Sequence, residues 1–303
     1  MSESRHPPSL DPVAAGRWAR QPVASSPWLH EEIASRMQQR LDVIRLQPSA
    51  WLDWEPLRGG LQAHEALHRR YLQAERWLWC QQAQEAGQVR THLQAPWWQP
   101  SRWRGGRLTM GLPGPGQVQM VWANMALHHS ADPMGLIRQW HQALSTDGFL
   151  MLSCLGPDTL RELRELYKTQ GWGEPAHEFT DMHDWGDMLV QAGFAEPVMD
   201  MERITLTYAS PERLLQELRE LGRNLHHQRW PGLRGRGWHQ HLLQGLQALA
   251  RPDEQGRLAL TFEVIYGHAI KPQPRAKVQA HSEIAVDDLR QMLRSGRGQG
   301  RKL

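Results

Sequence analysis

The stretch WLDWEPLRGGLQAHEALHRR (residues 51–70) decides how this chain is expected to fold. A short apolar run leads to Asp53, a loop containing Gly59 and Gly60 follows, and an amphipathic helix comes next. This order is typical of nucleotide-binding α/β folds, because glycine lets the backbone approach a ligand and a helix start offers free N–H groups. The stretch therefore predicts a ligand site at the carboxyl end of its strand.

The same stretch contains HEALH, which matches the H-E-x-x-H pattern of zinc proteases. His64 and His68 have the spacing of two zinc ligands one helical turn apart, with Glu65 as the base. The usual third ligand is missing from the residues that follow, RRYLQAERW. Both histidines border the apolar face of the helix beside charged residues, so the sequence predicts solvent-side histidines and no metal site.

Short apolar runs alternate with amphipathic segments along the rest of the chain, which favours a parallel sheet with helices on both faces. Strands are predicted over residues 50–54, 75–80, 117–123, 148–154, 198–207 and 259–267. Helices are predicted over residues 28–41, 60–72, 133–144, 158–169, 184–192, 211–222 and 238–250.

Length and composition set the class of protein. The 303 residues are enough for one large domain or two small ones. The sequence contains no apolar run of the roughly 18 residues that a membrane span needs, and its first residues have no apolar signal-peptide core, so a cytoplasmic protein is expected. Cys80 and Cys154 are too few for a disulfide framework and are expected as buried thiols. Residues 1–27 and the basic tail 273–303 are expected to be disordered.

Three later segments carry a family resemblance: VWANMALHHSADPMGLIRQWHQALSTDGFLMLSCLGPDTLRELRELY (121–167), FTDMHDWGDMLVQAGFAEPVMDMERITLTY (179–208) and RLALTFEVIYGHAIKP (257–272). Together they resemble the malonyl-[acyl-carrier protein] O-methyltransferase family of biotin synthesis and its relative, the mitochondrial complex I assembly-factor branch. GPDTLREL and MHDWGDMLVQAGF are the most specific pieces. The resemblance implies a Rossmann-like class I methyltransferase domain over about 28–272, dependent on S-adenosylmethionine. Its sheet would have seven strands, mostly parallel with an antiparallel last strand, and a helical cap would be inserted over about 209–252.

The resemblance also implies which residues form the cofactor loop. The family reads LD-x-G-x-G-x-G, and here Asp53 and Gly59 match, while Glu55 and Leu57 replace the first two glycines. Leu57 would put a branched side chain where the backbone approaches the cofactor, and Glu55 a carboxylate near the methionine carboxylate. Cys80 falls where the family has an acidic residue for the ribose hydroxyls. The implied cofactor-binding positions are Asp53, Glu55, Leu57, Gly59 and Cys80.

The substrate half matches the family more closely. The resemblance implies that Asn124 and His128 lie where the methyl group meets the acceptor, so they are the candidate catalytic residues. A malonyl carboxylate on an acidic carrier protein needs cationic partners. The candidates for substrate binding are Arg161, Arg164 and Arg203, with Arg219 and Arg223 as further ones. The family's N-terminal tyrosine has no counterpart, and Trp18 is the nearest aromatic residue.

Three functions remain open from the sequence. The first is a methyltransferase that uses S-adenosylmethionine to methylate a malonyl group on an acyl-carrier protein. The second is a catalytically inactive relative, a pseudo-methyltransferase with a binding or assembly role, because the cofactor loop departs from the family. The third and least favoured is nucleic-acid binding through the basic tail and RWPGLRGRGW (229–238).

Overall fold

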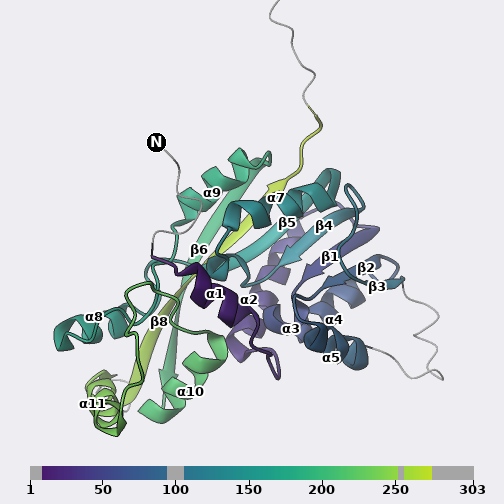
Figure 1. The fold of residues 1–303 in the computed structure, drawn as a ribbon. Coiled ribbons are helices and arrows are strands. Elements are labelled where there is room, and N and C mark those ends of the chain that lie inside the picture. Colours follow the sequence, from purple (N-terminus) through teal and green to yellow (C-terminus); the bar gives the residue numbers. More distant parts are fainter. Residues whose placement is uncertain (1–8, 94–105, 252–255, 275–303) are drawn as a thin grey trace, which may run out of the picture. The chain divides into compact units, whose positions relative to one another are not determined.

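The computed structural model describes residues 9–93, 106–251 and 256–274. The chain divides into two compact units, Met1–Pro272 and Gln273–Leu303. The first unit is built on one twisted sheet with helices on both faces (Figure 1). Nearly all of the predicted basic tail lies outside the described residues.

The sheet is mostly parallel with an antiparallel last strand, as predicted. Its strands follow the order β3-β2-β1-β4-β5-β8-β6, and the short β7 pairs with β8. Strands β1 to β5 run parallel to one another, whereas β8 is antiparallel to both β5 and β6. This arrangement confirms the predicted fold class. The strands are β1 (Ala50–Trp54), β2 (Glu75–Trp79), β3 (Leu108–Met110), β4 (Val118–Ala123), β5 (Leu144–Leu155), β6 (Ala195–Tyr208), β7 (Ala250–Arg251) and β8 (Arg257–Ile270).

The helices follow the sequence signals for their starts. Asp132 accepts a hydrogen bond from the Gly135 N–H at the start of α7, and the Ser210 side chain does the same for Arg213 in α10. No helix in the described ranges is long and apolar enough to cross a membrane. The α-helices are α1 (Pro12–Ala19), α2 (Trp28–Gln39), α3 (Pro56–Gly59), α4 (Leu61–Arg70), α5 (Ala83–Leu93), α7 (Pro133–Ala143), α8 (Arg161–Gln170), α9 (Met182–Gln191), α10 (Pro211–Leu221) and α11 (Arg236–Gln247), with 3-10 turns at Arg40–Val43 and Leu127–His129.

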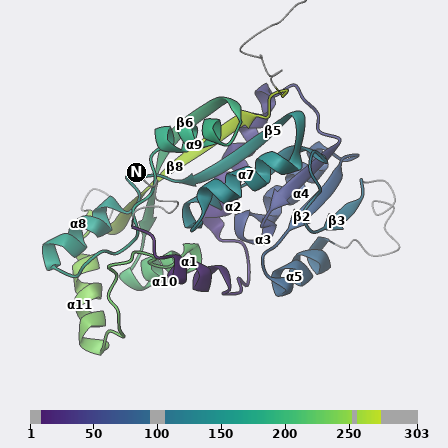
Figure 2. The same ribbon diagram turned by 45° about the horizontal axis from the view of Figure 1, so that its top comes forward.

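Each face of the sheet has its own core, because successive residues of a strand point to opposite faces. Trp51 and Trp122 belong to the cluster that includes the apolar side chains of α2 and α4. Leu52 and Val121 belong to the other cluster, with the apolar side chains of α7 and α9. The helices of the two clusters lie on opposite faces of the sheet (Figures 1 and 2).

The prediction that residues 1–27 are disordered is wrong for residues 9–27. They include α1, and Leu10 before this helix packs with Ala14 and Ala15 of the helix against Leu225 beyond α10. The Asp11 carboxylate also pairs with Arg229 at 2.7 Å. The apolar face of α1 is too small to be recognised in the sequence. The helix is stabilised by a partner more than 200 residues away in the chain, which sequence patterns do not reveal.

The HEALH motif is a packing feature in this structure. His64 is fully buried, and its Nδ1 bonds the Asp53 carboxylate at 2.8 Å. Burial raises the pKa of Asp53, and the bond from His64 opposes that shift. The prediction of a solvent-side His64 is therefore wrong, because α4 turns this residue towards β1. The described residues contain no group of three or more His, Cys, Asp or Glu arranged to hold a metal.

Replacing His64 by alanine is expected to lower the free energy of unfolding by about 2–4 kcal/mol, because the buried Asp53 carboxylate loses its partner. His68→Ala, on the same helix but only half-buried, is the control and is expected to cost about 1 kcal/mol or less. Denaturant unfolding followed by circular dichroism measures both. Equal losses for the two variants would contradict the structural role of His64.

Candidate functional site

A cavity of about 320 Å³ opens at the carboxyl ends of β1, β2 and β4. Ligands of open α/β sheets bind at this end of the strands. The residues that line it come from strand ends, from α1, α2, α3, α7 and α10, and from the 3-10 turn after β4. Those used below are Trp18, Glu55, Arg58, Gln81, Asn124 and His129, together with Trp54 and Trp79, whose rings stack at 3.9 Å.

The loop after β1 forms a helical turn. Glu55 adopts the left-handed conformation, with φ 56° and ψ 58°, at the position of the family's first glycine. The Gly59 N–H then bonds the Glu55 carbonyl at 2.8 Å, which closes the turn α3. Leu57 packs against Leu61 and other apolar residues, outside the cavity lining. Its side chain therefore does not fill the cavity as the sequence implied.

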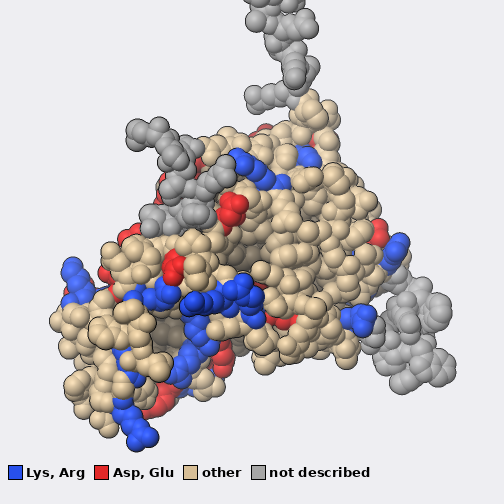
Figure 3. All heavy atoms as spheres, viewed as in Figure 1, with Lys and Arg blue, Asp and Glu red and all other residues tan. Residues whose placement is uncertain are grey.

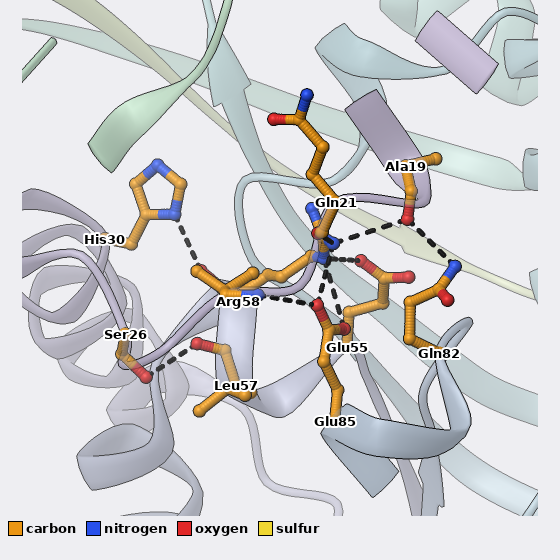
Figure 4. A network of polar contacts seen from close by, with 10 residues as sticks. Ala19, Gln21, Ser26, His30, Glu55, Leu57, Arg58, Gln82 and Glu85 are labelled. Atoms are coloured by element: carbon orange, nitrogen blue, oxygen red, sulfur yellow. Dashed lines mark hydrogen bonds and ion pairs between the residues drawn. The ribbon is translucent and has the colours of Figure 1, made fainter. Parts of the chain in front are cut away.

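Arg58 crosses one side of the cavity and binds two carboxylates (Figure 4). Its Nη2 lies 2.7 Å from Glu85 Oε1, and its Nε lies 3.4 Å from Glu55 Oε2. The same Nη2 donates to the Gln21 carbonyl at 2.5 Å, and Ala19 offers a second carbonyl at 3.3 Å. Glu85 in turn accepts a hydrogen bond from the Val23 N–H. This network, named the Arg58 network below, joins the loop to α5 and to the segment after α1.

Burial sets the charge state of the carboxylate at the cavity. It raises the pKa of Glu55 to about 7; the Arg58 guanidinium opposes this rise and the Glu85 carboxylate adds to it. Glu55 therefore carries a partial negative charge at neutral pH. Burial also lowers the pKa of His30 to about 4 and that of His129 well below its usual value, so both imidazoles are neutral at pH 7.

Asn124 lies in the cavity wall and has all of its side-chain bonds in use. Its Nδ2 donates to the His30 carbonyl at 2.8 Å and to the Gly59 carbonyl, and its Oδ1 accepts from Ser153. A Cβ on Gly59 would lie only 3.0 Å from the Asn124 carbonyl oxygen. Asn124 therefore fixes the loop against α2 and β5, and glycine is needed for this close approach.

The structure places His129, and not His128, in the cavity lining. His128 is buried outside the cavity lining, and its ring nitrogens bond none of the described residues. His129 lines the cavity and meets the Trp18 ring edge-on at 6.1 Å. The reason is the 3-10 turn at Leu127–His129, which reverses the chain after β4 and turns adjacent side chains to different sides.

Other implied cofactor positions also lie outside the lining. Asp53 points away from the cavity towards His64. Cys80 packs beside the apolar cluster of Leu57, and burial raises the pKa of its thiol to about 12, so it stays neutral. Gln81, the next residue, lines the cavity instead.

The three arginines predicted to bind substrate do not line this cavity. Arg164 donates to the carbonyls of Thr159, Ala176 and His177. Arg203 pairs with Asp158 at 2.7 Å. The exposed Arg161 contacts its neighbour Glu162 at 3.3 Å. Arg164 and Arg203 therefore stabilise the fold around α8 and β8.

Sequence reasoning missed Arg58, His129 and the aromatic walls. Two guanidinium groups lie over the Trp18 ring, that of Arg58 at 5.5 Å and that of Arg223 at 5.3 Å from its centroid. Trp54 and Trp79 could have been found, because each ends a strand at the predicted ligand edge. Arg58 gave a weaker signal, a charged residue inside a loop where glycine is usual.

Comparison with known proteins identifies the family. The chain is 40% identical over 266 residues to the malonyl-[acyl-carrier protein] O-methyltransferase of Gallionella capsiferriformans, which covers 82% of this chain and 85% of that protein. The chain belongs to the malonyl-[acyl-carrier protein] O-methyltransferase family. A second family member, from Methylovorus sp., is 35% identical over 252 residues, covering 82% of this chain and 83% of its own length. No family model matches the chain.

Solved structures agree on the fold of this family member. A candidate methyltransferase from Bacillus halodurans superposes with a TM-score of 0.52 at 15% identity, covering 80% of this chain and 100% of its own. The YcgJ protein of Bacillus subtilis gives the same TM-score at 14% identity, with 79% and 99% covered. At these identities the likeness concerns the fold alone.

Replacing Arg58 by alanine is expected to release residues 19–23 from the Arg58 network. A charged hydrogen bond contributes about 1.5–3 kcal/mol, so amide hydrogen exchange in this segment should become roughly 10- to 100-fold faster. Arg161→Ala, which removes an exposed pair, is the control and should leave this exchange unchanged. Unchanged exchange in Arg58→Ala would show that α1 alone holds the segment.

Proposed function

We propose that this chain transfers a methyl group from S-adenosylmethionine to the free carboxylate of a malonyl group carried by an acyl-carrier protein. The observation that carries the proposal is the cavity at the carboxyl ends of β1, β2 and β4, in a chain 40% identical to a named malonyl-[acyl-carrier protein] O-methyltransferase. The position, volume and charge of the cavity support this proposal.

The residues of the cavity fit a sulfonium cofactor. Its volume of about 320 Å³ lies at the lower end of the range for small-molecule sites. When Glu55 is ionised, the two carboxylates of the Arg58 network and its single guanidinium leave one net negative charge beside the cavity. The stacked rings of Trp54 and Trp79 add an aromatic wall of the kind that attracts cations.

The proposed chemistry needs little acid–base catalysis. S-adenosylmethionine supplies an electrophilic methyl group, whose bond to sulfur breaks as the bond to the acceptor oxygen forms. The acceptor is a carboxylate that is already ionised at neutral pH, so no base has to remove a proton. The enzyme then contributes mainly orientation and exclusion of water.

Three residues of this chain can provide that contribution. Trp18 on α1 lines the cavity together with residues from the strand ends, and its ring can exclude water there. His129 stays neutral and can donate its N–H to an acceptor oxygen. Asn124 keeps the loop and α2 in place through its side-chain bonds.

The mouth of the cavity suits an acidic carrier protein. Residues of α1 and α10 line the cavity, and exposed arginines lie on these two helices or within two residues of their ends. Lys and Arg side chains gather on the face where α1 and α10 lie (Figure 3). A positive field of this kind attracts an acidic partner and speeds its association. The arginines in question are Arg17, Arg20, Arg219 and Arg223.

A second candidate function is that of an inactive family member with a binding role. The Arg58 network favours it, because Nη2 of Arg58 is already bonded to the carbonyls of Ala19 and Gln21 and to Glu85, which leaves less of the guanidinium for a cofactor. Nucleic-acid binding through residues 229–238 has less support. Arg229 is paired with Asp11, and Arg234 lies over the rings of Trp230 and Trp238.

The direct test incubates the purified protein with S-adenosylmethionine and malonyl-carrier protein and follows the carrier by mass spectrometry. The expected product is the malonyl methyl ester, with acetyl-carrier protein, which lacks the free carboxylate, as the control that stays unmodified. If the protein binds the carrier but forms no ester, the inactive alternative replaces the proposal.

Changing both Arg17 and Arg219 to glutamate is expected to raise KM for malonyl-carrier protein roughly tenfold with little change in kcat, because the positive field at the mouth is reversed. The KM for a small malonyl thioester should stay unchanged. Arg90→Glu, exposed on α5 away from the mouth, is the matched control. An equal rise for both substrates would mean that the two arginines act on the cavity rather than on the carrier.

A further inference from the structure

In the turn after β1, backbone groups that a glycine loop would offer a ligand are hydrogen-bonded within the protein. The N–H groups of Arg58 and Gly59 both bond the Glu55 carbonyl, and the Gly60 N–H bonds the Pro56 carbonyl. The Gly59 carbonyl accepts from Asn124. A ligand in this cavity therefore meets side chains of the turn where a glycine loop would present its backbone.

Two of these side chains have opposite charge and lie side by side. Glu55 and Arg58 both line the cavity, each with 14% of its side chain exposed, and their charged groups are 3.4 Å apart. Within the described ranges, Nη1 of Arg58 donates to no residue, whereas Nε and Nη2 are in use. A carboxylate next to a guanidinium with free hydrogens complements the ammonium and carboxylate groups of an α-amino acid.

We infer that Glu55 and Arg58 form the subsite for the amino-acid end of the cofactor, with Glu55 binding its ammonium group and Arg58 Nη1 its carboxylate. The inference rests on the proposed function, since it names how this chain holds S-adenosylmethionine. Two charged side chains thereby replace the glycine backbone contacts of the loop. The left-handed backbone of Glu55 belongs to this arrangement, because it is the turn's first residue and directs the carboxylate into the cavity.

The charge states around Glu55 give the subsite a pH dependence. His30 and His129 are neutral at pH 7, the Cys80 thiol is neutral, and Asp53 is bonded to His64. Binding an ammonium group favours the ionised form of Glu55 and lowers its pKa from about 7. Affinity should therefore rise as the pH increases from 6 to 8, with proton release on binding near pH 7. The charged and titratable groups that act on Glu55 are Arg58, Glu85 and Cys80, and the cavity lining also contains His30, His129 and Glu220.

The test compares two ligands by calorimetry on the full chain at pH 6, 7 and 8. S-adenosylhomocysteine has the amino-acid end, and 5′-methylthioadenosine lacks it. Glu55→Gln keeps the shape of the side chain and removes its charge. This variant should bind S-adenosylhomocysteine roughly 10- to 100-fold more weakly at pH 8 and lose the pH dependence, while 5′-methylthioadenosine binds as in the wild type.

Two further variants sharpen the result. Glu65→Gln, a partly exposed glutamate on α4, is the control and should bind both ligands as the wild type does. Glu55→Gly restores the family's glycine and relieves the left-handed backbone, so a loss of fold is not expected. It should still bind S-adenosylhomocysteine more weakly than the wild type, because the carboxylate is gone.

The outcomes separate this inference from the proposed function. If S-adenosylhomocysteine binds Glu55→Gln as tightly as the wild type, or Glu55→Gly more tightly, the subsite is wrong while methyl transfer stands. If the wild type binds neither ligand at millimolar concentration and forms no malonyl ester, the proposed function fails and the subsite fails with it.

Discussion

The ion pair between Arg58 and Glu85 is the contact on which the site depends. It joins the loop after β1 to the start of α5, and through the carbonyls of Ala19 and Gln21 it also fixes the segment between α1 and α2. Glu85 is 1% exposed, so loss of Arg58 would leave a buried carboxylate without its main partner. Arg58 thereby holds both the loop after β1 and the segment after α1, and residues of both segments line the cavity.

The sheet could be predicted from the sequence because its signal is repeated. Apolar runs such as residues 50–54 and 148–154 are bounded by turns and alternate with amphipathic helices, so errors in one element do not change the topology. The elements that were missed are short or depend on distant partners. β3 has three residues, and α5 contains Gly87 and shows little apolar periodicity.

The site was harder to predict, because a motif gives positions along the chain and not the direction of a side chain. Asn124 and Glu55 were placed at the ligand edge, and both line the cavity. The sequence suggested His128, but the neighbouring His129 lines the cavity, because the tight turn points adjacent side chains in different directions. Asp53 and Cys80 lie at the ends of β1 and β2, as predicted. Their side chains are nevertheless packed towards α4 and α5 and do not line the cavity.

This chain can belong to the family although its loop after β1 lacks the family's first two glycines. Backbone amides and a pair of charged side chains can both recognise a zwitterion, but the charged pair costs desolvation and makes binding depend on pH. The loop of this chain has the charged pair, and its turn has bonded its own backbone groups. The account thus predicts retention of the adenosyl ligand with a changed set of contacts.

A crystal structure of the protein with S-adenosylhomocysteine tests this claim most directly. The account predicts the ligand's amino nitrogen at about 3 Å from the Glu55 carboxylate and its carboxylate on Arg58, within ordinary hydrogen-bond distance. A ligand whose amino group bonds backbone carbonyls, with Glu55 turned away and no bond between Arg58 and the ligand's carboxylate, would contradict it.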